Sequence, residues 1–379
     1  MTRLYFVRHV EAEGNLYRIC EGQYNGALSP RGEAQLSCVS AYFADIPLDA
    51  VYSSDLYRAY RTAQAAASAS GLPVIPCRGL REYDFGSYEG ESWGDINRRF
   101  PEEQHHFYHD LRGFRAPGGE SAACVAQRMT DTVKRLANRH PGGSIVIVGH
   151  SAAMGTFFPA VQMPFDQVRE LQYMKNASVT VMDWDGERFH MVRYNDTSHL
   201  SHLPVGDHFT TRPKVEFSYR FADPVRDRDW ICHCGEAAWQ AVYGNLRLFS
   251  MERFYENARG LLLDHSRNGI IPLADGQPAG ILLLDSRQQD EPATGHISLI
   301  YLQPEFRGMG LGAQLIGKAV VEYRRRGMDT LRLNVASVNQ SAQRFYTRLR
   351  FRREETRRPF ARQYVMRMSI AVPQITAQE

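Results

Sequence analysis

The sequence predicts two domains of mixed α/β structure in one chain of 379 residues. Strands and helical stretches alternate up to about residue 200, a pattern that predicts a largely parallel sheet with helices on both faces. The stretch 197–213, TSHLSHLPVGDHFTTRP, is rich in turn-forming and polar residues and marks a boundary. The order of strands and helices changes after it. We therefore place a first domain at residues 1–203, a linker at 204–213 and a second domain at 214–379.

The composition is that of a globular protein without a strong charge bias. Hydrophobic residues make up 43% of the chain, charged residues 23%, and the formal net charge of +3 gives no basic field for nucleic acid. Six scattered cysteines suit a reducing compartment. The chain starts without a signal-peptide pattern, and no apolar run reaches the ~20 residues that span a bilayer. We expect a cytoplasmic protein without nucleic-acid or membrane partners, and the oligomeric state stays open.

The first domain begins with LYFV at residues 4–7, whose aromatic and β-branched side chains predict a buried strand. A helix over SPRGEAQLSCVSAYFA starts with Ser29 as its cap and Pro30 in its first turn. DAVYSS predicts a second strand before an alanine-rich helix that ends at Gly71, and GSIVIVG predicts a third strand before another helix. VTVMDWDGERFHMVRYN contains a DG turn and predicts a hairpin at the sheet edge.

Ionisable side chains follow three of these strands. They are the pair Arg8-His9, then Arg58, and His150. The carboxyl ends of parallel strands lie along one edge of a sheet, so these side chains are expected to meet there. Two arginines and a helix amino terminus suit a phosphate dianion, and an unprotonated histidine can attack phosphorus. Glu82, in LREYDFGSYEG, offers an acid for the leaving alkoxide.

Five motifs in order, FVRHVEAEGN, YSSDLYRAYRTA, LREYDFGSYEG, GGES and VGHS, resemble those of the histidine phosphatase superfamily, which includes the cofactor-dependent phosphoglycerate mutases. The resemblance covers roughly residues 1 to 200 and implies a three-layer α/β/α, phosphoglycerate mutase-like fold. It implies that His9 is phosphorylated on a ring nitrogen and that Glu82 donates the proton. Arg8, Arg58 and His150 would hold the phosphoryl oxygens.

Two further residues of the first motif bear on this site. Asn15 matches a family asparagine near the phosphate. Val10 stands where the family usually has glycine. A side chain there is expected to alter the backbone near the phosphate or to narrow the pocket, which leaves a weak or silent site as an alternative.

The reaction class follows from the length of one segment. The mutases carry a longer insertion after the glutamate motif, whereas here only about two dozen residues separate YEGES from PGGES. The end of the domain, RYNDTSHL, resembles phosphatases related to α-ribazole phosphatases. We expect a phosphatase that needs no cofactor. The alternatives are a mutase-type phosphotransferase, or a degenerate module that senses a phosphorylated metabolite or coenzyme A.

Two groups of side chains resemble metal ligands. Cys232-His233-Cys234 has no second Cys/His pair at workable spacing, so we expect no zinc site. His105, His106 and His109 in HHFYHD are expected to form a solvated or substrate-facing surface. We therefore expect no metal in either domain.

The second domain opens with the strand VEFSYRF and a helical stretch over about 227–243. GIIPLAD and AGILLLD form a hairpin through GQP, and the strand HISLIYLQP runs into EFRGMGLG and the helix AQLIGKAVVEYRRR. Gly308, Gly310 and Gly312 lie between that strand and helix, where glycine lets backbone N–H groups converge on a phosphate.

RGMGLG resembles the arginine/glutamine-x-x-glycine-x-glycine signature of the Gcn5-related acetyltransferases (GNAT), and the resemblance covers roughly residues 215 to 370. LRLNVASVNQSAQRFYTRLRF resembles the next strand and helix of that family, although the family's usual "GF" is Arg350-Phe351 here. The resemblance implies an α+β acyltransferase fold that uses acetyl-CoA to acetylate a small-molecule amine, so that the chain would be a bifunctional enzyme.

The GNAT resemblance also assigns individual residues. Acetyl-CoA would be bound by Leu302, by the backbone of the loop that contains Arg307, Gly308, Gly310 and Gly312, and by Asn339 at the next helix start. Tyr346 would protonate the departing thiolate. An amine must lose its proton before it attacks a thioester, and the sequence does not choose between His296 and Glu305 as the base. The acceptor and the phosphoester substrate stay open.

Overall fold

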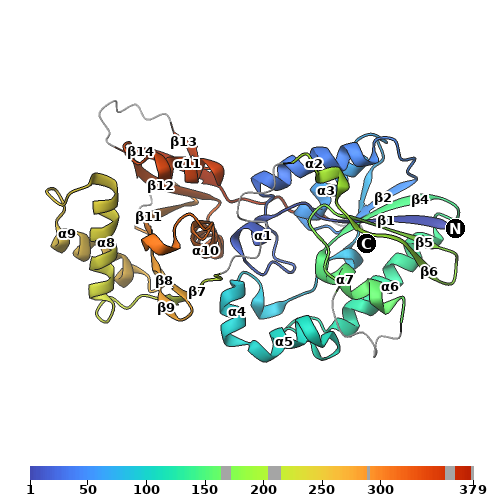
Figure 1. The fold of residues 1–379 in the computed structure, drawn as a ribbon, viewed down its shortest axis with the longest axis horizontal. Helices are drawn as coiled ribbons and strands as arrows, with labels where there is room; N and C mark the ends of the chain where they lie inside the picture. The colour runs from blue at the N-terminus through green and yellow to red at the C-terminus, as the bar shows by residue number, and fades with distance from the viewer. Residues whose placement is uncertain (164–171, 204–214, 288–290, 355–362, 377–379) are drawn as a thin grey trace. The chain divides into compact units, whose positions relative to one another are not determined.

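The computed structural model describes residues 1–163, 172–203, 215–287, 291–354 and 363–376. This chain divides into two compact units (Figure 1). The N-terminal unit comprises Met1–Glu91, Ile96–Thr210 and Val372–Glu379, and the C-terminal unit comprises Ser92–Asp95 and Thr211–Ala371. The linker predicted at 204–213 lies outside the described residues. None of the described helices is long and apolar enough to cross a membrane.

The N-terminal unit contains a six-stranded sheet in the order β3-β2-β4-β1-β5-β6. Its strands are β1 (Thr2–Arg8), β2 (Ala50–Ser53), β3 (Val74–Pro76), β4 (Ser144–Gly149), β5 (Val179–Trp184) and β6 (Phe189–Asp196). β1 to β4 pair in parallel, whereas β5 and β6 form an antiparallel hairpin at the edge. The predicted parallel sheet with an edge hairpin is confirmed.

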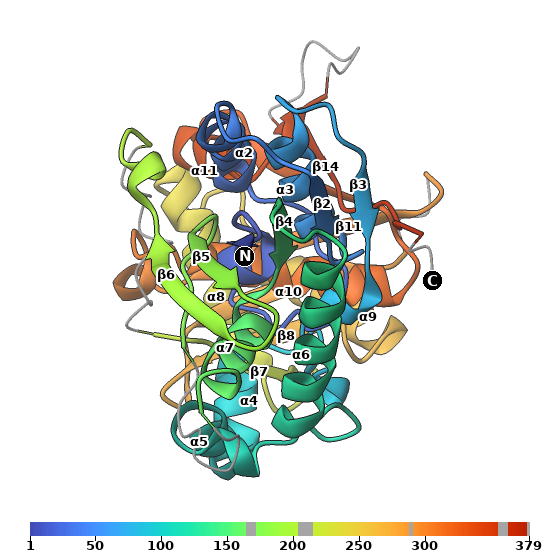
Figure 2. The same ribbon diagram turned by 90° about the vertical axis from the view of Figure 1, so that its right-hand side faces the viewer.

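Helices cover both faces of this sheet, with α2 and α3 on one side and α6 and α7 on the other (Figures 1 and 2). The helices are α1 (Glu13–Tyr17), α2 (Pro30–Phe43), α3 (Tyr57–Ala67), α4 (Trp93–Arg99), α5 (Pro101–His109), α6 (Ala122–Asn138) and α7 (Ser151–Ala160). Short 3₁₀ turns are η1 (Arg78–Leu80), η2 (Gly86–Tyr88), η3 (Leu111–Gly113) and η5 (Ser198–Leu200). The three-layer α/β/α prediction is confirmed.

Side chains along β1 alternate between the two faces of the sheet, which explains why helices pack on both faces. Phe6 points to α7, where its ring centroid lies 5.5 Å from that of Phe157 and 5.2 Å from that of Phe158. Tyr5 points to the opposite face and lies 5.7 Å from Phe43 of α2. Successive side chains of a strand project to opposite faces, so an apolar run such as LYFV is buried only between two helical layers.

Local signals set the helix ends. The hydroxyl oxygen of Ser29 accepts a hydrogen bond from the Gly32 N–H (3.0 Å), and Pro30 occupies the first turn of α2, as predicted. α3 ends at Ala67, four residues before Gly71, because the chain leaves the helix through a turn first. Such differences of a few residues are usual for helix ends.

The C-terminal unit contains an eight-stranded sheet in the order β13-β14-β12-β11-β10-β8-β7, with β9 paired to β8. Its strands are β7 (Ser218–Phe221), β8 (Gly269–Ala274), β9 (Gln277–Pro278), β10 (Gly280–Asp285), β11 (Thr294–Leu302), β12 (Thr330–Ala336), β13 (Arg352–Arg353) and β14 (Gln363–Ser369). Its helices are α8 (Arg228–Tyr243), α9 (Met251–Asp264), α10 (Gly312–Arg325) and α11 (Gln340–Arg348), with the 3₁₀ turn η6 (Pro304–Phe306).

One helix of this unit was not expected from the sequence. α9 follows α8 and is capped by Ser250, whose hydroxyl oxygen accepts from the Arg253 N–H (3.3 Å). Both helices pack on one face of the sheet, against Ile281 and Leu283 of β10. α10 also packs on β10 and β11. The predicted mixed α+β fold, with its β8–β10 hairpin, is confirmed.

Candidate active sites

The ends of β1 and β4 bring two predicted histidines together. Arg8 and Gly149 are partners in the parallel ladder, and the His9 N–H donates to the Gly149 carbonyl (3.0 Å). His9 and His150 therefore leave the sheet side by side, with their ring centroids 5.1 Å apart. The strand pairing alone accounts for this contact between residues distant in sequence.

His9 has the protonation state of a nucleophile. Its Nδ1 lies 2.7 Å from the carbonyl oxygen of Val10. A carbonyl oxygen only accepts, so Nδ1 carries the proton and Nε2 keeps its lone pair. Burial, followed by the positive charges of Arg58 and Arg8, holds the pKa of His9 well below its ordinary value of 6.5. The imidazole is therefore neutral at physiological pH.

Both arginines are buried beside this ring. Arg58 is 1% exposed and donates to the carbonyl oxygens of Gly22 (2.6 Å) and Tyr24 (3.1 Å). Arg8 is 5% exposed and donates to the Met174 carbonyl. Backbone carbonyls fix both guanidinium groups. Arg58 also forms an ion pair with the buried carboxylate of Glu21, whose Oε2 lies 3.5 Å from Nε.

His150 is fully buried, and its Nε2 lies 2.8 Å from the hydroxyl oxygen of Ser54. Burial, then the positive charge of Arg58, lowers the pKa of His150 well below 6.5. Ser54 follows β2, so it comes from the same edge of the sheet. Ser54 lies inside a motif that the sequence analysis quoted, but its role was not foreseen.

Glu82 is held at the amino terminus of α7, the helix that follows His150. One carboxyl oxygen accepts from the Ala153 N–H (2.7 Å) and the Tyr83 N–H (3.1 Å), and the other accepts from the Ala152 N–H (3.1 Å). This side chain is 8% exposed. The structure therefore places the predicted proton donor next to the predicted phosphate-binding histidine.

A second layer of contacts positions the segment that carries Glu82. Arg128 of α6 donates to the carbonyl oxygens of Gly79 (3.0 Å) and Arg81 (2.9 Å). Glu120, from the GGES motif, accepts from Arg128 through both carboxylate oxygens (2.9 and 2.8 Å). This ion pair ties α6 to the backbone in front of Glu82, which gives the GGES motif a positioning role.

Asn15 is joined to the site by a residue that the sequence analysis missed. Asn176 donates through Nδ2 to the carbonyl oxygen of His9 (3.1 Å) and to Oδ1 of Asn15 (3.1 Å). The only sequence signal for Asn176 is its place just before β5, in KNAS.

Val10 belongs to the core of the N-terminal unit. Its side chain is fully buried in the core cluster that includes Val7 and Ala59, and its N–H donates to the hydroxyl oxygen of Thr62 (3.1 Å). The side chain thus packs toward α3 and the core.

The histidines of α5 and the cysteines of α8 form no recognisable metal centre. The rings of His105 and His109 lie 5.0 Å apart. Within the described residues, no group of three or more histidine, cysteine or acidic side chains is arranged to hold a metal ion.

In the C-terminal unit, β11 and β12 separate part-way along their length. They pair in parallel from Thr294 and Thr330 as far as Ile297 and Leu333. β11 then continues to Leu302 and β12 to Ala336 without further pairing between them in the described chain. Within the described chain, the stretch 298–302 therefore has no strand partner on this side.

The predicted glycine loop follows β11. Gly308 and Gly310 have φ values of +72° and +77°, a region that side chains rarely adopt. In the described part of the chain, the N–H groups of residues 308–312 donate to no backbone carbonyl. Helix α10 starts at Gly312 with no side-chain cap. These free donors at a helix amino terminus fit the pyrophosphate of acetyl-CoA.

The remaining predicted residues of this unit lie around the same loop and on α11. Arg307 donates through Nε to the Leu302 carbonyl (2.9 Å). Asn339 caps α11 by accepting from the Ala342 N–H (3.1 Å). Burial raises the pKa of Tyr346 to about 12, so its phenol stays protonated at neutral pH. His296 is buried on β11 and Glu305 is exposed, and neither position identifies the base.

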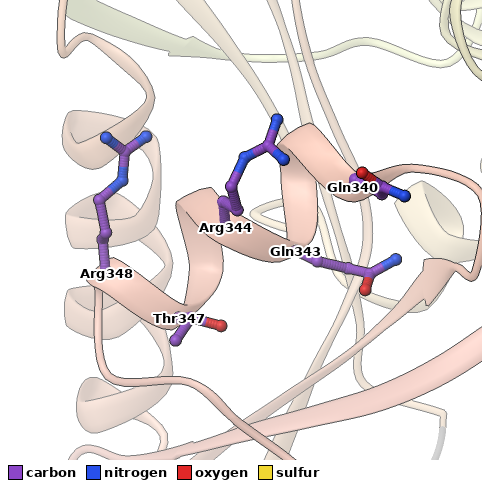
Figure 3. Close-up of a pocket in the computed structure, with 5 residues that line it drawn as sticks. All are labelled: Gln340, Gln343, Arg344, Thr347 and Arg348. Atoms are coloured by element: carbon purple, nitrogen blue, oxygen red, sulfur yellow. The ribbon is translucent and has the colours of Figure 1, made fainter.

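A pocket of about 550 Å³, lined by polar residues, lies on α11 (Figure 3). Its lining is Gln340, Gln343, Arg344, Thr347 and Arg348. The two arginines stand one helical turn apart, and within the described residues no carboxylate pairs with either. The pocket is therefore positively charged, on the same helix as Asn339 and Tyr346.

Comparison with known proteins identifies the family of the larger part of the chain. Residues 4–197, more than half of the sequence, match the histidine phosphatase superfamily (branch 1). The chain belongs to this superfamily. Residues 229–351 match the acetyltransferase (GNAT) family, so one chain combines a histidine phosphatase domain with a GNAT domain. Both predicted family resemblances are confirmed.

Several relatives resemble the histidine phosphatase domain over nearly their whole length. Phosphoserine phosphatase 1 of Hydrogenobacter thermophilus is 29% identical over 209 residues, which cover 55% of this chain and 99% of that protein. Phosphoglycerate mutase-like protein 4 of Arabidopsis thaliana is 30% identical over 51% of this chain and 85% of its own. The solved structure of Bacillus stearothermophilus YhfR superposes with a TM-score of 0.50 at 29% identity, covering 53% of this chain and 100% of that one.

Proposed function

We propose that the histidine phosphatase domain hydrolyses phosphomonoesters through a phosphohistidine at Nε2 of His9. The observation that carries this proposal is the hydrogen bond from Nδ1 to the Val10 carbonyl, because it leaves Nε2 unprotonated beside two fixed guanidinium groups. A neutral nucleophile next to positive charge is what attack on a phosphate dianion needs.

In the proposed hydrolysis, a named side chain is assigned to each chemical step. Nε2 of His9 attacks phosphorus, and the bond from phosphorus to the leaving alkoxide breaks as Glu82 delivers a proton to that oxygen. Arg8, Arg58 and His150 hold the phosphoryl oxygens. Water then attacks the phosphohistidine, Glu82 takes its proton, and inorganic phosphate leaves with His9 neutral again. Hydrogen bonds from the helix amino terminus orient the Glu82 carboxyl toward this centre.

We also propose that the GNAT domain transfers an acetyl group to a small-molecule amine. Acetyl-CoA supplies the activated acetyl group when bound. The free N–H groups of residues 308–312 hold its pyrophosphate, and the unpaired stretch 298–302 of β11 holds its extended arm. The protonated phenol of Tyr346 is available to donate a proton to the leaving thiolate.

The decisive experiment is a screen of phosphorylated metabolites for release of inorganic phosphate by the full chain, first without and then with a bisphosphorylated cofactor. The same screen is repeated with acetyl-CoA and amines, and free thiol is measured. Phosphate release supports the phosphatase. Interconversion of phosphoglycerate isomers without net phosphate release would instead establish the mutase alternative, and thiol release that depends on an amine supports acetyl transfer.

A further inference from the structure

A row of titratable side chains crosses the sheet of the C-terminal unit, one on each of five strands that are neighbours in the sheet (Figure 1). Asp285 of β10 stands opposite His296 of β11, and His296 stands opposite Arg332 of β12. Arg367 of β14 lies opposite Arg332, and Arg352 of β13 lies opposite Arg367. Side chains at directly paired positions project to the same face of a sheet. Three arginines therefore share one face.

Solvent reaches this face at the arginine end of the row. Along β12, Leu331 and Leu333 are buried on one face of the sheet. Arg332 and Asn334 alternate with them on the other face, where Arg332 is half-buried and Asn334 is exposed. Arg352 is also exposed. The three-strand edge of this face is thus accessible to a ligand.

The charges of the three arginines are only partly balanced. Glu291 pairs with Arg332 (3.4 Å) and with Arg367. Glu354 pairs with Arg367 (2.6 Å). Arg352 has no ion-pair partner among the described residues. Like charges that stand directly opposite each other destabilise a sheet, and two carboxylates here separate three guanidinium groups. One positive charge is left over, and an anionic ligand would balance it.

The guanidinium group of Arg332 also has donors available for a ligand. Within the described chain, its one hydrogen bond runs from Nη1 to Glu291 over 3.4 Å, which is long for an N–H donor. Its Nε is buried and has no hydrogen-bond partner in the described residues. A buried donor without an acceptor is unfavourable. At the other end of the row, Asp285 is paired with Arg287 (3.2 Å), so the surplus charge lies on the arginine side.

This row lies next to the point where the proposed acetyl transfer takes place. β11 and β12 separate one residue beyond the row. The proposed pyrophosphate site at 308–312 follows the end of β11, so an arm that lies along 298–302 carries its acetyl group back to the point of separation. Helix α10 packs on the opposite face of β11, where Tyr323 lies against Gly295. An amine can therefore approach the acetyl group from the face that carries the arginines.

We propose that the amine acetylated by the GNAT domain carries an anionic group, and that Arg332 and Arg352 bind this group beside the acetyl group. This inference rests on the proposed acetyl transfer. Guanidinium groups bind carboxylates and phosphoryl groups through paired N–H donors. Two strand spacings, roughly 10 Å, separate the backbones of Arg332 and Arg352, so both long side chains can reach one anion between them. The acceptor class is thus a small amine with a carboxylate or a phosphoryl group.

The test measures free thiol released by the full chain from acetyl-CoA with matched amines. Serine is compared with serinamide, in which an amide replaces the carboxylate. 2-Aminoethylphosphonate is compared with ethanolamine, which lacks the phosphonate, and a phosphatase cannot cleave its C–P bond. At least one anionic amine should have a kcat/KM about tenfold or more above that of its neutral partner. Arg332→Gln and Arg352→Gln should each lower this kcat/KM about tenfold, mainly through KM, and change the neutral amines less than about twofold.

Arg353→Gln is the matched control. Arg353 is the next residue of the same strand and is equally exposed, but it projects to the other face, where its guanidinium group stacks on the ring of Tyr364. This variant should keep the preference for the anionic amine.

Each outcome separates this inference from the function on which it rests. A preference that Arg332→Gln and Arg352→Gln abolish and Arg353→Gln keeps supports the inference, and the preferred pair identifies the anion as carboxylate or phosphoryl. A wild-type protein that prefers the neutral amines or shows no preference overturns it while acetyl transfer stands. Equal losses on both members of a pair, or an equal loss in Arg353→Gln, also overturn it. A wild-type protein that releases no thiol with any amine overturns the proposed acetyl transfer and this inference with it.

Discussion

The imidazole of His9 donates a hydrogen bond through Nδ1 to the carbonyl oxygen of Val10, the next residue in the chain, over 2.7 Å. The backbone itself thus sets the tautomer and the orientation of the ring. This carbonyl is held in place because the Val10 side chain is fully buried in the core and its N–H is bonded to Thr62. Valine in place of the usual glycine is therefore compatible with an active nucleophile.

The first prediction concerns the covalent intermediate. Incubation of the full chain with a ³²P-labelled phosphomonoester should give acid-labile, base-stable label on the protein. His9→Ala should reduce this label to background because it removes the ring nitrogen that the hydrogen bond to the Val10 carbonyl leaves unprotonated. His190→Ala, at an exposed histidine paired with Asp185, should keep the label. Label that survives in His9→Ala would place the phosphoryl group elsewhere.

The second prediction concerns the protonation of His9. Its pKa in the folded chain lies well below 6.5, mainly through burial and then through Arg58 and Arg8. Histidine-selective NMR should therefore show no titration of His9 between pH 8 and 6.5. Arg58→Gln should raise the midpoint, whereas Arg58→Lys should keep it low because the charge is retained. An unchanged midpoint in Arg58→Gln would contradict the electrostatic explanation.

The same shift fixes the sign of a stability effect. Below pH 6.5 the unfolded chain binds a proton at His9 that the folded chain does not, so the free energy of unfolding falls as the pH is lowered through this value. One such histidine changes the free energy of unfolding by at most about 1.4 kcal/mol per pH unit. His9→Asn should make the pH dependence of the unfolding temperature shallower in this range.

Much of the fold, and the meeting of His9 and His150 at one sheet edge, could be predicted from the sequence. Strand ends that carry Arg8, His9 and His150 follow continuous apolar runs, and the sheet topology brings such ends together whatever the details of packing. The cap at Ser29 and the edge hairpin follow from local rules of the same kind.

Other residues could not be found in this way. Ser54 and Asn176 are small polar residues without a distinctive neighbourhood, and their partners lie 96 and 161 positions away. The direction of the Val10 side chain depends on how β1 packs against α3, which no single residue encodes. The sequence analysis did not assign α9, although Ser250 supplies a cap signal for it.

The third prediction concerns the proton donor. General acid catalysis contributes about 10²–10⁴-fold, so Glu82→Gln should slow hydrolysis of alkyl phosphates by that much. The loss should be small for p-nitrophenyl phosphate, whose leaving group needs little protonation. Both carboxyl oxygens of Glu82 accept hydrogen bonds from backbone N–H groups. In Glu82→Gln, the side-chain NH₂ group would face one of these N–H donors, so the substitution should also lower the unfolding temperature.

Steady-state kinetics on both substrates tests this role for Glu82. Glu102→Gln, on the exposed face of α5, is the matched control and should change neither rate. Equal losses on alkyl and p-nitrophenyl phosphates in Glu82→Gln would show that the residue only positions α7.

The last prediction separates the two activities by a single substitution in the glycine loop. Gly310→Glu places a bulky, negative side chain where φ is +77° and where free N–H groups converge. It should weaken acetyl-CoA binding at least tenfold in titration calorimetry, because the side chain blocks and repels the pyrophosphate.

Gly327→Glu is the matched control. Gly327 follows the opposite end of α10, its φ is +75°, and nothing lies within 4 Å of the added Cβ. The backbone strain is therefore similar, and the glycine loop stays intact. Phosphate release should be unchanged in both variants because His9, Arg58 and Glu82 belong to the other unit. If Gly310→Glu folds but loses phosphate release while Gly327→Glu keeps it, the two activities are coupled and the division of labour proposed here is wrong.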